Sequence, residues 1–153
     1  MSDKVIERIR KGVGGKLRRI EAKSPRRVYL DVAPQDLLDA VRYIFDDLQA
    51  RYAIASGIEV EDGFEVLHHF VFDSDHVVVS VRVKASSEKP EVPSITSVVK
   101  GADFIEREMH DLLGIDFPGH PNMARLILAE DWPEGVYPLR RGKPWEGRIE
   151  KRL

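Results

Sequence analysis

The sequence GFEVLHHFVFDSDHVVVSVRVK, residues 63–84, decides the fold because it predicts two successive strands joined by a short turn. In its second half, the valines at positions 77, 79, 81 and 83 point to one face, and the residues between them point to the other. This period of two is typical of a strand with one buried face and one solvated face. The turn at 73–75 carries the polar residues Asp-Ser-Asp. We therefore expect a sheet whose buried face is lined by these valines.

The segments before this pair predict helices and further strands. Residues 33–52 form the clearest helical pattern, with apolar side chains at helical spacing along one face that we expect to be core. Residues 15–23 and 26–33 are predicted to be strands. An N-terminal helix is expected to begin at a Ser2 cap and to end at Gly12. Together these elements predict an α+β fold, with a mixed or antiparallel sheet and helices packed on it.

The chain length of 153 residues favours one domain with enough sequence to bury a core. We expect that domain to span residues 1–140, followed by an extended basic arm at 141–153. No apolar run approaches the roughly 18 residues that a membrane-spanning helix needs. The start of the chain, MSDKVIERIRKG, does not resemble a secretory signal.

Composition excludes several kinds of chemistry. Cysteine is absent, so this chain forms no disulfide, offers no thiolate nucleophile and supplies no cysteine ligand to an iron–sulfur cluster. Charged residues make up 33% of the chain but only three residues are amides, a trend that favours a hot source. The charge is uneven: residues 1–27 carry +7, residues 28–139 carry −13 and residues 140–153 carry +4. Basic ends on an acidic body suggest nucleic-acid contact or docking onto acidic partners.

The segment DFIEREMHDLLGIDFPGHP, residues 103–121, predicts a short helix at 104–113. Asp103 and Glu106 have the spacing of a capping box, and loss of the cap in Asp103→Ala is expected to cost about 1 kcal/mol. Gly114 stands where a residue with positive φ commonly ends a helix. The apolar stripe of this helix consists of Ile105, Met109, Leu112 and Leu113. We expect that stripe to hold the helix against the core.

The charged residues of this helix lie off the apolar stripe. Arg107 and Asp111 are four residues apart and are expected to pair for a few tenths of a kcal/mol. Glu108 and Asp111 are like charges three residues apart, so they call for a cation from a basic partner surface or from Arg125. On an open helix face such carboxylates are expected to be solvated rather than catalytic. The segment is therefore interpreted as a rigid recognition surface.

Metal and hydrolase sites have weaker support. His110 beside Asp111, and His120, could bind a metal, but no His-x-x-x-His pair is present. His68 and His69 are adjacent on a predicted strand and should face opposite sides. His120 is expected instead to fix its loop through a hydrogen bond. A Ser–His–Asp hydrolase lacks the support of a nucleophile elbow. We therefore predict no catalytic residue and no metal ligand.

A series of short motifs occurs in a fixed order through the second half of the chain. They are PSITS at 93–97, ERE at 106–108, Asp111, GI at 114–115, Phe117, GHP at 119–121, RLIL at 125–128 and PLR at 138–140. In this order and spacing they resemble the signature of the respiratory complex I 30-kDa subunit family, the C-type subunit of NADH–quinone oxidoreductase. The resemblance covers roughly residues 28–141.

The resemblance implies a non-catalytic subunit in the hydrophilic arm of a membrane-bound, ion-pumping electron-transfer complex. Members hold no cofactor and pack against a hydrogenase-like large subunit and iron–sulfur subunits. The iron–sulfur clusters, and in hydrogenase-type relatives a nickel–iron centre, belong to those partners. The chain would then be peripheral, on the cytoplasmic side of the cell membrane, and attached through its partners. The expected partner-subunit interface consists of Glu106, Arg107, Glu108, Asp111, Gly114, Phe117, Gly119, His120, Pro121, Arg125, Pro138, Arg140 and Trp145.

The chain departs from the family after the PLR motif. Complex I members usually continue with a basic residue, an acid and an aromatic–proline step, whereas residues 140–153 read RRGKPWEGRIEKRL and lack that acid. This difference favours a hydrogenase-type or sulfur-reducing relative, with a quinone-reducing complex I as the alternative. Trp145 could anchor the arm on a partner or pack on its own domain.

A nucleic-acid-binding module is the alternative from another functional class. It would use the basic residues 1–27, but no aromatic residue for base stacking precedes Tyr29. On sequence grounds we therefore do not expect nucleic acid as a partner.

Overall fold

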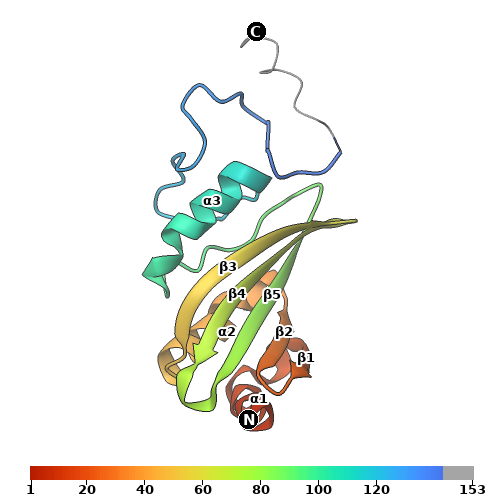
Figure 1. Ribbon diagram of the computed structural model, residues 1–153, viewed down its shortest axis with the longest axis vertical. Coiled ribbons are helices and arrows are strands. Elements are labelled where there is room, and N and C mark those ends of the chain that lie inside the picture. Colours follow the sequence, from red (N-terminus) through yellow and green to blue (C-terminus); the bar gives the residue numbers. More distant parts are fainter. Residues whose placement is uncertain (143–153) are drawn as a thin grey trace.

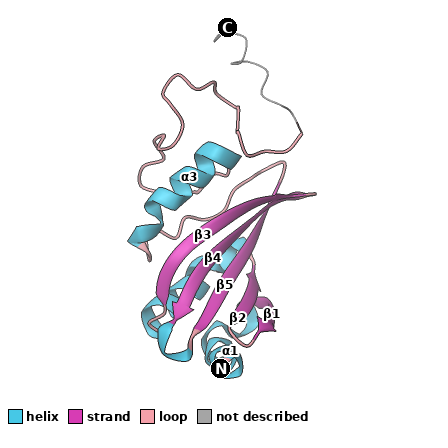
Figure 2. Cartoon of the chain, viewed as in Figure 1, coloured by secondary structure: helices cyan, strands magenta, loops and turns pink. Residues whose placement is uncertain are grey.

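A five-stranded mixed sheet in the spatial order β1-β2-β5-β4-β3 is the centre of the fold (Figures 1 and 2). The structure, a computed structural model, describes residues 1–142. The strands are β1 Leu17–Ser24, β2 Arg27–Val32, β3 Arg51–Val60, β4 Gly63–Phe72 and β5 Val77–Ser86. Within the described residues the α-helices are α1 Ser2–Val13, α2 Leu37–Arg42 and α3 Asp103–Leu113. The predicted α+β class is confirmed. Trp145 and residues 143–153 of the predicted arm lie outside the described residues, so the arm stays a prediction.

The β4–β5 pair confirms the segment that predicted the sheet. It is antiparallel and in continuous register from Gly63 opposite Ser86 to Phe72 opposite Val77. β2 runs parallel to β5, and the two outer pairs, β1–β2 and β3–β4, are antiparallel. The odd-numbered valines of β5 are fully buried, as their alternation predicts.

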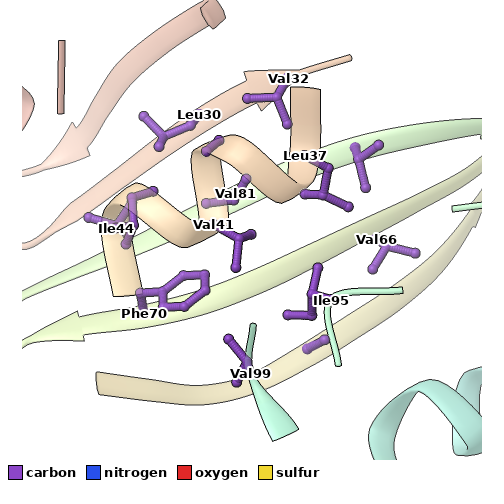
Figure 3. Close-up of a cluster of buried hydrophobic side chains, with 14 of the residues drawn as sticks. Leu30, Val32, Leu37, Val41, Ile44, Val66, Phe70, Val81, Ile95 and Val99 are labelled. Carbon is purple, nitrogen blue, oxygen red and sulfur yellow. The ribbon is translucent and has the colours of Figure 1, made fainter. Parts of the chain in front are cut away.

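The core lies on the valine face of the sheet. Figure 3 shows Leu37 and Val41 of α2, and Ile44 of the helical turn that follows it, over the strand residues Leu30, Val81 and Phe70. Ile95 and Val99, from the segment that leads into α3, extend the same cluster, and all of these side chains are at most 3% exposed. Full burial of such a side chain contributes about 1.5–3 kcal/mol. Helix α2 and the segment that leads into α3 therefore cover the same face of the sheet.

The opposite face of the sheet is polar. Arg82 on β5 forms a bidentate pair with Asp31 on β2, at 2.7 and 3.0 Å, and its guanidinium lies 3.6 Å from Glu65. His69 bridges Ser56 at 3.0 Å and Ser80 at 2.8 Å. This face carries the polar half of the alternation that the sequence predicts, although Ser80 is buried there and Arg82 is largely covered.

His68 points the opposite way from His69, as predicted. It is fully buried, and neither ring nitrogen has a hydrogen-bond partner among the described residues. Burial, with a smaller contribution from neighbouring His69, lowers the pKa of His68 to about 3. The ring is therefore neutral at physiological pH.

The N-terminal helix differs from the prediction at both ends. Ser2 is the first helical residue rather than a cap, and it makes no capping hydrogen bond. The helix passes through Gly12 and ends at Gly14, whose φ of 51° suits a residue without a side chain. Gly12 has a packing role instead: a β-carbon there would lie 2.0 Å from the ring of Tyr43. The Tyr43 hydroxyl donates to the carbonyl of Arg8 at 3.2 Å, which holds the ring over α1.

The predicted helix at 33–52 is too long. Its backbone starts with a 3₁₀ turn, becomes α2, and ends in a π-helical turn at Tyr43–Asp47. Gln49 then adopts a φ of 54°, and its side-chain amide donates to the carbonyl of Asp46 at 2.6 Å. This turn redirects the chain into β3, a strand that the helical prediction missed. Tyr52 therefore belongs to β3 rather than to the helix.

Replacing Gly12 with alanine tests the packing of α1 on α2. Alanine favours a helix over glycine by up to about 1 kcal/mol, yet here its β-carbon would overlap the Tyr43 ring. We expect Gly12→Ala to lower the free energy of unfolding by about 1–3 kcal/mol, measured by urea denaturation. Gly15→Ala is the control, because no atom lies within 4 Å of its β-carbon position. Equal effects of the two substitutions would contradict this account.

Candidate functional site

The segment that follows α3, residues 114–142, folds back along the helix without forming a helix or strand of its own (Figure 1). We call it the C-terminal strap. The NH of Leu139 donates to the carbonyl of Leu112 at 3.0 Å, so the far part of the strap returns to the end of α3. Nearly all residues of the predicted recognition surface lie on α3 or on this strap.

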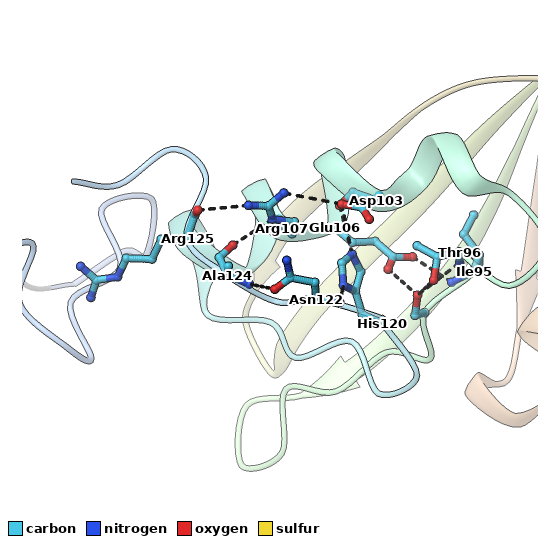
Figure 4. Close-up of polar contacts among 10 residues, drawn as sticks. Ile95, Thr96, Asp103, Glu106, Arg107, His120, Asn122, Ala124 and Arg125 are labelled. Atoms are coloured by element: carbon cyan, nitrogen blue, oxygen red, sulfur yellow. Dashed lines mark hydrogen bonds and ion pairs between the residues drawn. The ribbon is translucent and has the colours of Figure 1, made fainter. Parts of the chain in front are cut away.

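Glu106 is fully buried beneath α3 (Figure 4). Its Oε1 accepts the NH of Ile95 at 2.8 Å, and its Oε2 accepts the hydroxyl of Ser94 at 2.6 Å. Burial raises the pKa of this carboxyl, and the Ser94 and Ile95 donors and His120 only partly oppose that rise. The predicted capping box is therefore wrong, because Glu106 reaches across to the segment before α3.

Asp103 does not cap α3 either. It is the first residue inside the helix, after the 3₁₀ turn Lys100–Ala102, and no side-chain hydrogen bond caps this end. Its carboxylate lies 3.7 Å from both Arg107 and His120 (Figure 4). The predicted loss of a cap in Asp103→Ala therefore has no basis in the structure.

Asp111 holds the strap to α3. Its Oδ2 accepts the NH groups of Leu126, Ile127 and Leu128 at 2.9, 2.8 and 3.2 Å, and the residue is only 4% exposed. Burial acts to raise the pKa of this carboxyl, but the three NH donors outweigh it, so the pKa lies below its ordinary value. The prediction that Asp111 pairs with Arg107 is therefore wrong. The prediction that its carboxylate is solvated is also wrong, because the group is buried.

Arg107 and Arg125 bind carbonyl oxygens of the strap. Arg107 donates from Nε to Ala124 at 2.8 Å and from Nη2 to Arg125 at 3.1 Å (Figure 4). Arg125 donates from Nη1 to three carbonyls of its own turn, at positions 129, 130 and 132. Arg125 is therefore not the cation expected for Glu108 and Asp111. Glu108 is half-buried and has no ion-pair partner within residues 1–142.

His120 fixes the loop that opens the strap, as predicted. Its side chain is 1% exposed, and Nε2 donates to the carbonyl of Asp103 at 3.2 Å. Nδ1 accepts the NH of Asn122 at 3.1 Å. Gly119 has a φ of 91° beside it, and Pro121 is exposed. The GHP motif is thus a backbone turn pinned by a buried histidine.

The end of α3 is closed by Arg140. Gly114 has a φ of 70°, as predicted for the residue that ends this helix. Arg140 donates from Nε to the carbonyl of Leu113 at 2.7 Å, and its guanidinium stacks 4.5 Å from the ring of Tyr137. Phe117 is buried and Pro138 is exposed. The sequence does not predict that Arg140 caps α3, because 26 residues separate Arg140 from Gly114.

Bulky apolar side chains cover the outer side of this region. Phe104, Leu126, Ile127 and Leu139 are 65%, 39%, 52% and 59% exposed. We call these four residues the α3 face. Sequence reasoning did not single them out, although RLIL at 125–128 places apolar residues in a stretch without strand or helix. The polar groups beneath are occupied with backbone partners, so this surface is suited to recognition rather than to acid–base chemistry.

No helix among residues 1–142 is both long and apolar enough to cross a bilayer. In the same residues, no three His, Asp or Glu side chains gather closely enough to hold a metal ion.

Comparison with known families and proteins gives consistent matches. The family model described as respiratory-chain NADH dehydrogenase, 30 Kd subunit, matches residues 30–149. The C-type subunit of NADH-quinone oxidoreductase from Roseiflexus sp. (strain RS-1) is 33% identical over 147 residues, covering 92% of this chain and 82% of the relative. Its counterpart in Roseiflexus castenholzii is 36% identical over 119 residues, covering 74% of this chain and 67% of the relative. In Phocaeicola vulgatus, 83 residues match at 46% identity within a longer C/D-type subunit, of which they cover 15%.

Two known structures share the fold. A chain of the membrane-bound sulfane sulfur reductase, an archaeal respiratory membrane complex, superposes with a TM-score of 0.82 at 17% identity, covering 99% of this chain and 90% of that one. A trypsin-resistant fragment of Nqo5 superposes with a TM-score of 0.65 at 24% identity, covering 79% of this chain and 98% of the fragment.

Substitutions of Glu106 test its buried hydrogen bonds. Glu106→Ala removes the acceptor for the Ile95 NH and the Ser94 hydroxyl, so we expect a loss of about 1–3 kcal/mol in unfolding free energy. Glu106→Gln can accept from Ile95 and donate to Ser94, so it should cost less. Because the folded pKa is raised, wild-type stability should fall as the pH rises from about 4.3 through that pKa, and Glu106→Gln should lack this slope. Identical pH profiles for wild type and Glu106→Gln would refute the assignment.

Asp111→Asn tests the attachment of the strap. The lowered pKa means that the carboxylate contributes stability above its unfolded value of about 3.9, and that this is lost as the pH falls through the folded value. We expect Asp111→Asn to cost about 1–3 kcal/mol at pH 7, with the difference shrinking in acid. Amide exchange at residues 126–128 should accelerate. Glu108→Gln, with the same charge change on the same helix, should leave both measurements unchanged, and an equal effect there would argue against this role of Asp111.

Proposed function

The chain belongs to the respiratory-chain NADH dehydrogenase 30-kDa subunit family, and from that premise we propose that it is a non-catalytic structural subunit of a membrane-bound, ion-pumping oxidoreductase related to complex I. In this role it braces a hydrogenase-like large subunit and iron–sulfur subunits, which hold the redox cofactors. It is peripheral, on the cytoplasmic side of the membrane, and is attached through those partners.

The observation that carries the proposal is the exposed apolar α3 face, whose backbone is held in place by side chains of α3. Four of the large apolar side chains that the described residues expose belong to α3 and the strap. Asp111 and Arg107 bind the strap backbone from below, so the side chains above are already ordered before a partner arrives. Pre-organisation of this kind lowers the entropy cost of association.

The chemistry of the buried carboxylates supports a structural role. Glu106 and Asp111 use their oxygens to accept backbone and hydroxyl hydrogens, and each lies beneath the surface rather than in an open cleft. A general acid or base must reach a substrate proton within hydrogen-bond distance. These two groups are placed to hold the scaffold together.

A large neighbouring subunit is supported by the relatives. The matching segment of the Phocaeicola vulgatus protein is part of one polypeptide whose name joins the letters C and D. A C-type segment and a D-type segment that share a chain are held close together. We propose that this large neighbour contacts the α3 face.

The type of complex is the finer part of the proposal. The missing acid after the PLR motif favours a hydrogenase-type or sulfur-reducing relative, and the shape of the sulfane sulfur reductase chain, which covers 99% of this one, is consistent with it. The names of the sequence relatives favour the alternative, a quinone-reducing complex I. Co-purifying subunits distinguish the two types.

Charge substitutions on the α3 face test the proposed interface. An affinity-tagged chain carrying Ile127→Asp and Leu139→Asp should recover at least tenfold less of its partner subunits from solubilised native membranes, because aspartates would be desolvated in an apolar contact. Mass spectrometry of the wild-type sample identifies the partners. Antiporter-like subunits with a hydrogenase-like large subunit indicate the hydrogenase or sulfur-reducing type, and flavin-binding NADH subunits indicate complex I.

The control is Ile54→Asp with Ile58→Asp, which changes two exposed isoleucines on β3 by the same chemistry. It should leave recovery of the partners unchanged. Thermal unfolding of each isolated variant shows whether the fold is retained. Equal losses for both pairs, or a wild-type chain that recovers no oxidoreductase subunit, would overturn the proposal.

A further inference from the structure

A hollow lined by arginines lies where α1 turns into β1. These two elements lie at the opposite end of the molecule from α3 (Figure 1). Its volume is about 410 Å³, and its lining consists of Arg10, Gly14, Leu17, Arg18, Arg19 and Ile20. We call it the arginine hollow. It lies entirely before residue 30, where the match to the family begins.

Local backbone geometry brings the arginines together. α1 ends at Gly14, and a 3₁₀ turn at Gly14–Lys16 reverses the chain into β1. The register of β1 with β2 then shifts between Leu17 and Arg19, which interrupts the strict alternation of side chains. Two consecutive arginines can therefore line one hollow together with Arg10 from the helix.

The positive charge of the hollow is only partly balanced. Arg19 pairs with Glu21 at 2.6 Å, but Arg10 and Arg18 have no ion-pair partner among the described residues. The surrounding residues 1–27 carry ten basic and three acidic side chains. Two unpaired guanidinium groups at one hollow favour an anionic ligand, and a carboxylate can accept hydrogen bonds from both.

The neighbouring backbone suits an extended chain. β1 is an outer strand of the sheet, and its outward edge pairs with no strand among residues 1–142. The half-buried side chains of Leu17 and Ile20 form an apolar base beside that edge. An extended peptide can add to such an edge through main-chain hydrogen bonds, while its side chains enter adjacent hollows.

We propose that the arginine hollow and the free edge of β1 bind an extended acidic segment of a partner subunit, with one carboxylate held by Arg10 and Arg18. This inference rests on the proposed function, which supplies the partner subunits. Nucleic acid fits less well, because no aromatic side chain for base stacking occurs before Tyr29. A lipid surface fits less well because Leu17 and Ile20 are half-buried and do not project as membrane anchors.

A peptide of alternating Glu and Val residues serves as the probe, with an alternating Lys–Val peptide as its matched control. Calorimetry on the full chain should detect binding of the Glu–Val peptide that weakens as salt is raised, and no binding of the Lys–Val peptide. Arg10→Glu with Arg18→Glu should weaken that binding at least tenfold. The control is Arg26→Glu with Arg27→Glu, which makes the same charge change at the exposed β1–β2 turn. Because it removes only long-range attraction, it should weaken binding of the Glu–Val peptide less than about twofold.

Several results would overturn the docking site. They are no binding of the Glu–Val peptide at low salt, equal losses in the two double variants, and tighter binding of a DNA duplex or of phosphatidylglycerol vesicles than of the peptide. Pull-down from native membranes separates this inference from the proposed function. A chain that recovers oxidoreductase subunits but does not bind the peptide overturns the docking site alone. A chain that binds the peptide but recovers no such subunit overturns the proposed function.

Discussion

The middle of the C-terminal strap is held to α3 by one carboxylate oxygen, Oδ2 of Asp111, which accepts three consecutive backbone NH groups. Residues 126–128 have no strand or helix partner, so without this acceptor their NH groups would need water or another group. With it, the peptide planes are fixed and the side chains of Leu126 and Ile127 are directed outward, where both are exposed. One buried acid therefore orders residues 126–128 and leaves their apolar side chains on the outer surface.

Glu106 and Asp111 are two buried carboxyls whose pKa values shift in opposite directions. Both residues are at most 4% exposed. Asp111 has three NH donors at one oxygen, and these stabilise the charged form enough to lower its pKa. Glu106 has a hydroxyl and one NH as donors, and its desolvation prevails, so its pKa rises. The balance between desolvation and donated hydrogen bonds therefore decides whether each carboxyl favours its protonated or its charged form.

The sequence predicts the regular parts of this structure well because their determinants are local. The alternation in β5 and the positive φ of Gly114 follow from spacing and steric rules. The helix at 33–52 was overextended because its apolar spacing continues past Asp47, whereas Gln49 turns the chain into β3. The charged residues of α3 were misassigned for another reason. Helical neighbours suggested partners four residues away, but Asp111 binds backbone groups 15 to 17 residues further along the chain.

The α3 face and the arginine hollow are connected through the sheet. The α3 face is carried by a helix that packs on β3, where Gly57 allows Met109 and Leu113 to approach the strand closely. The arginine hollow is carried by β1, at the other edge of the same sheet. Hydrogen bonds along every strand pair from β1 to β3 connect the two edges. A close-packed sheet resists small displacements, so partners bound at its two edges would be held at a fixed separation. Electron transfer between separate subunits requires stable distances between their cofactors, and a subunit of this construction would maintain them without carrying electrons itself.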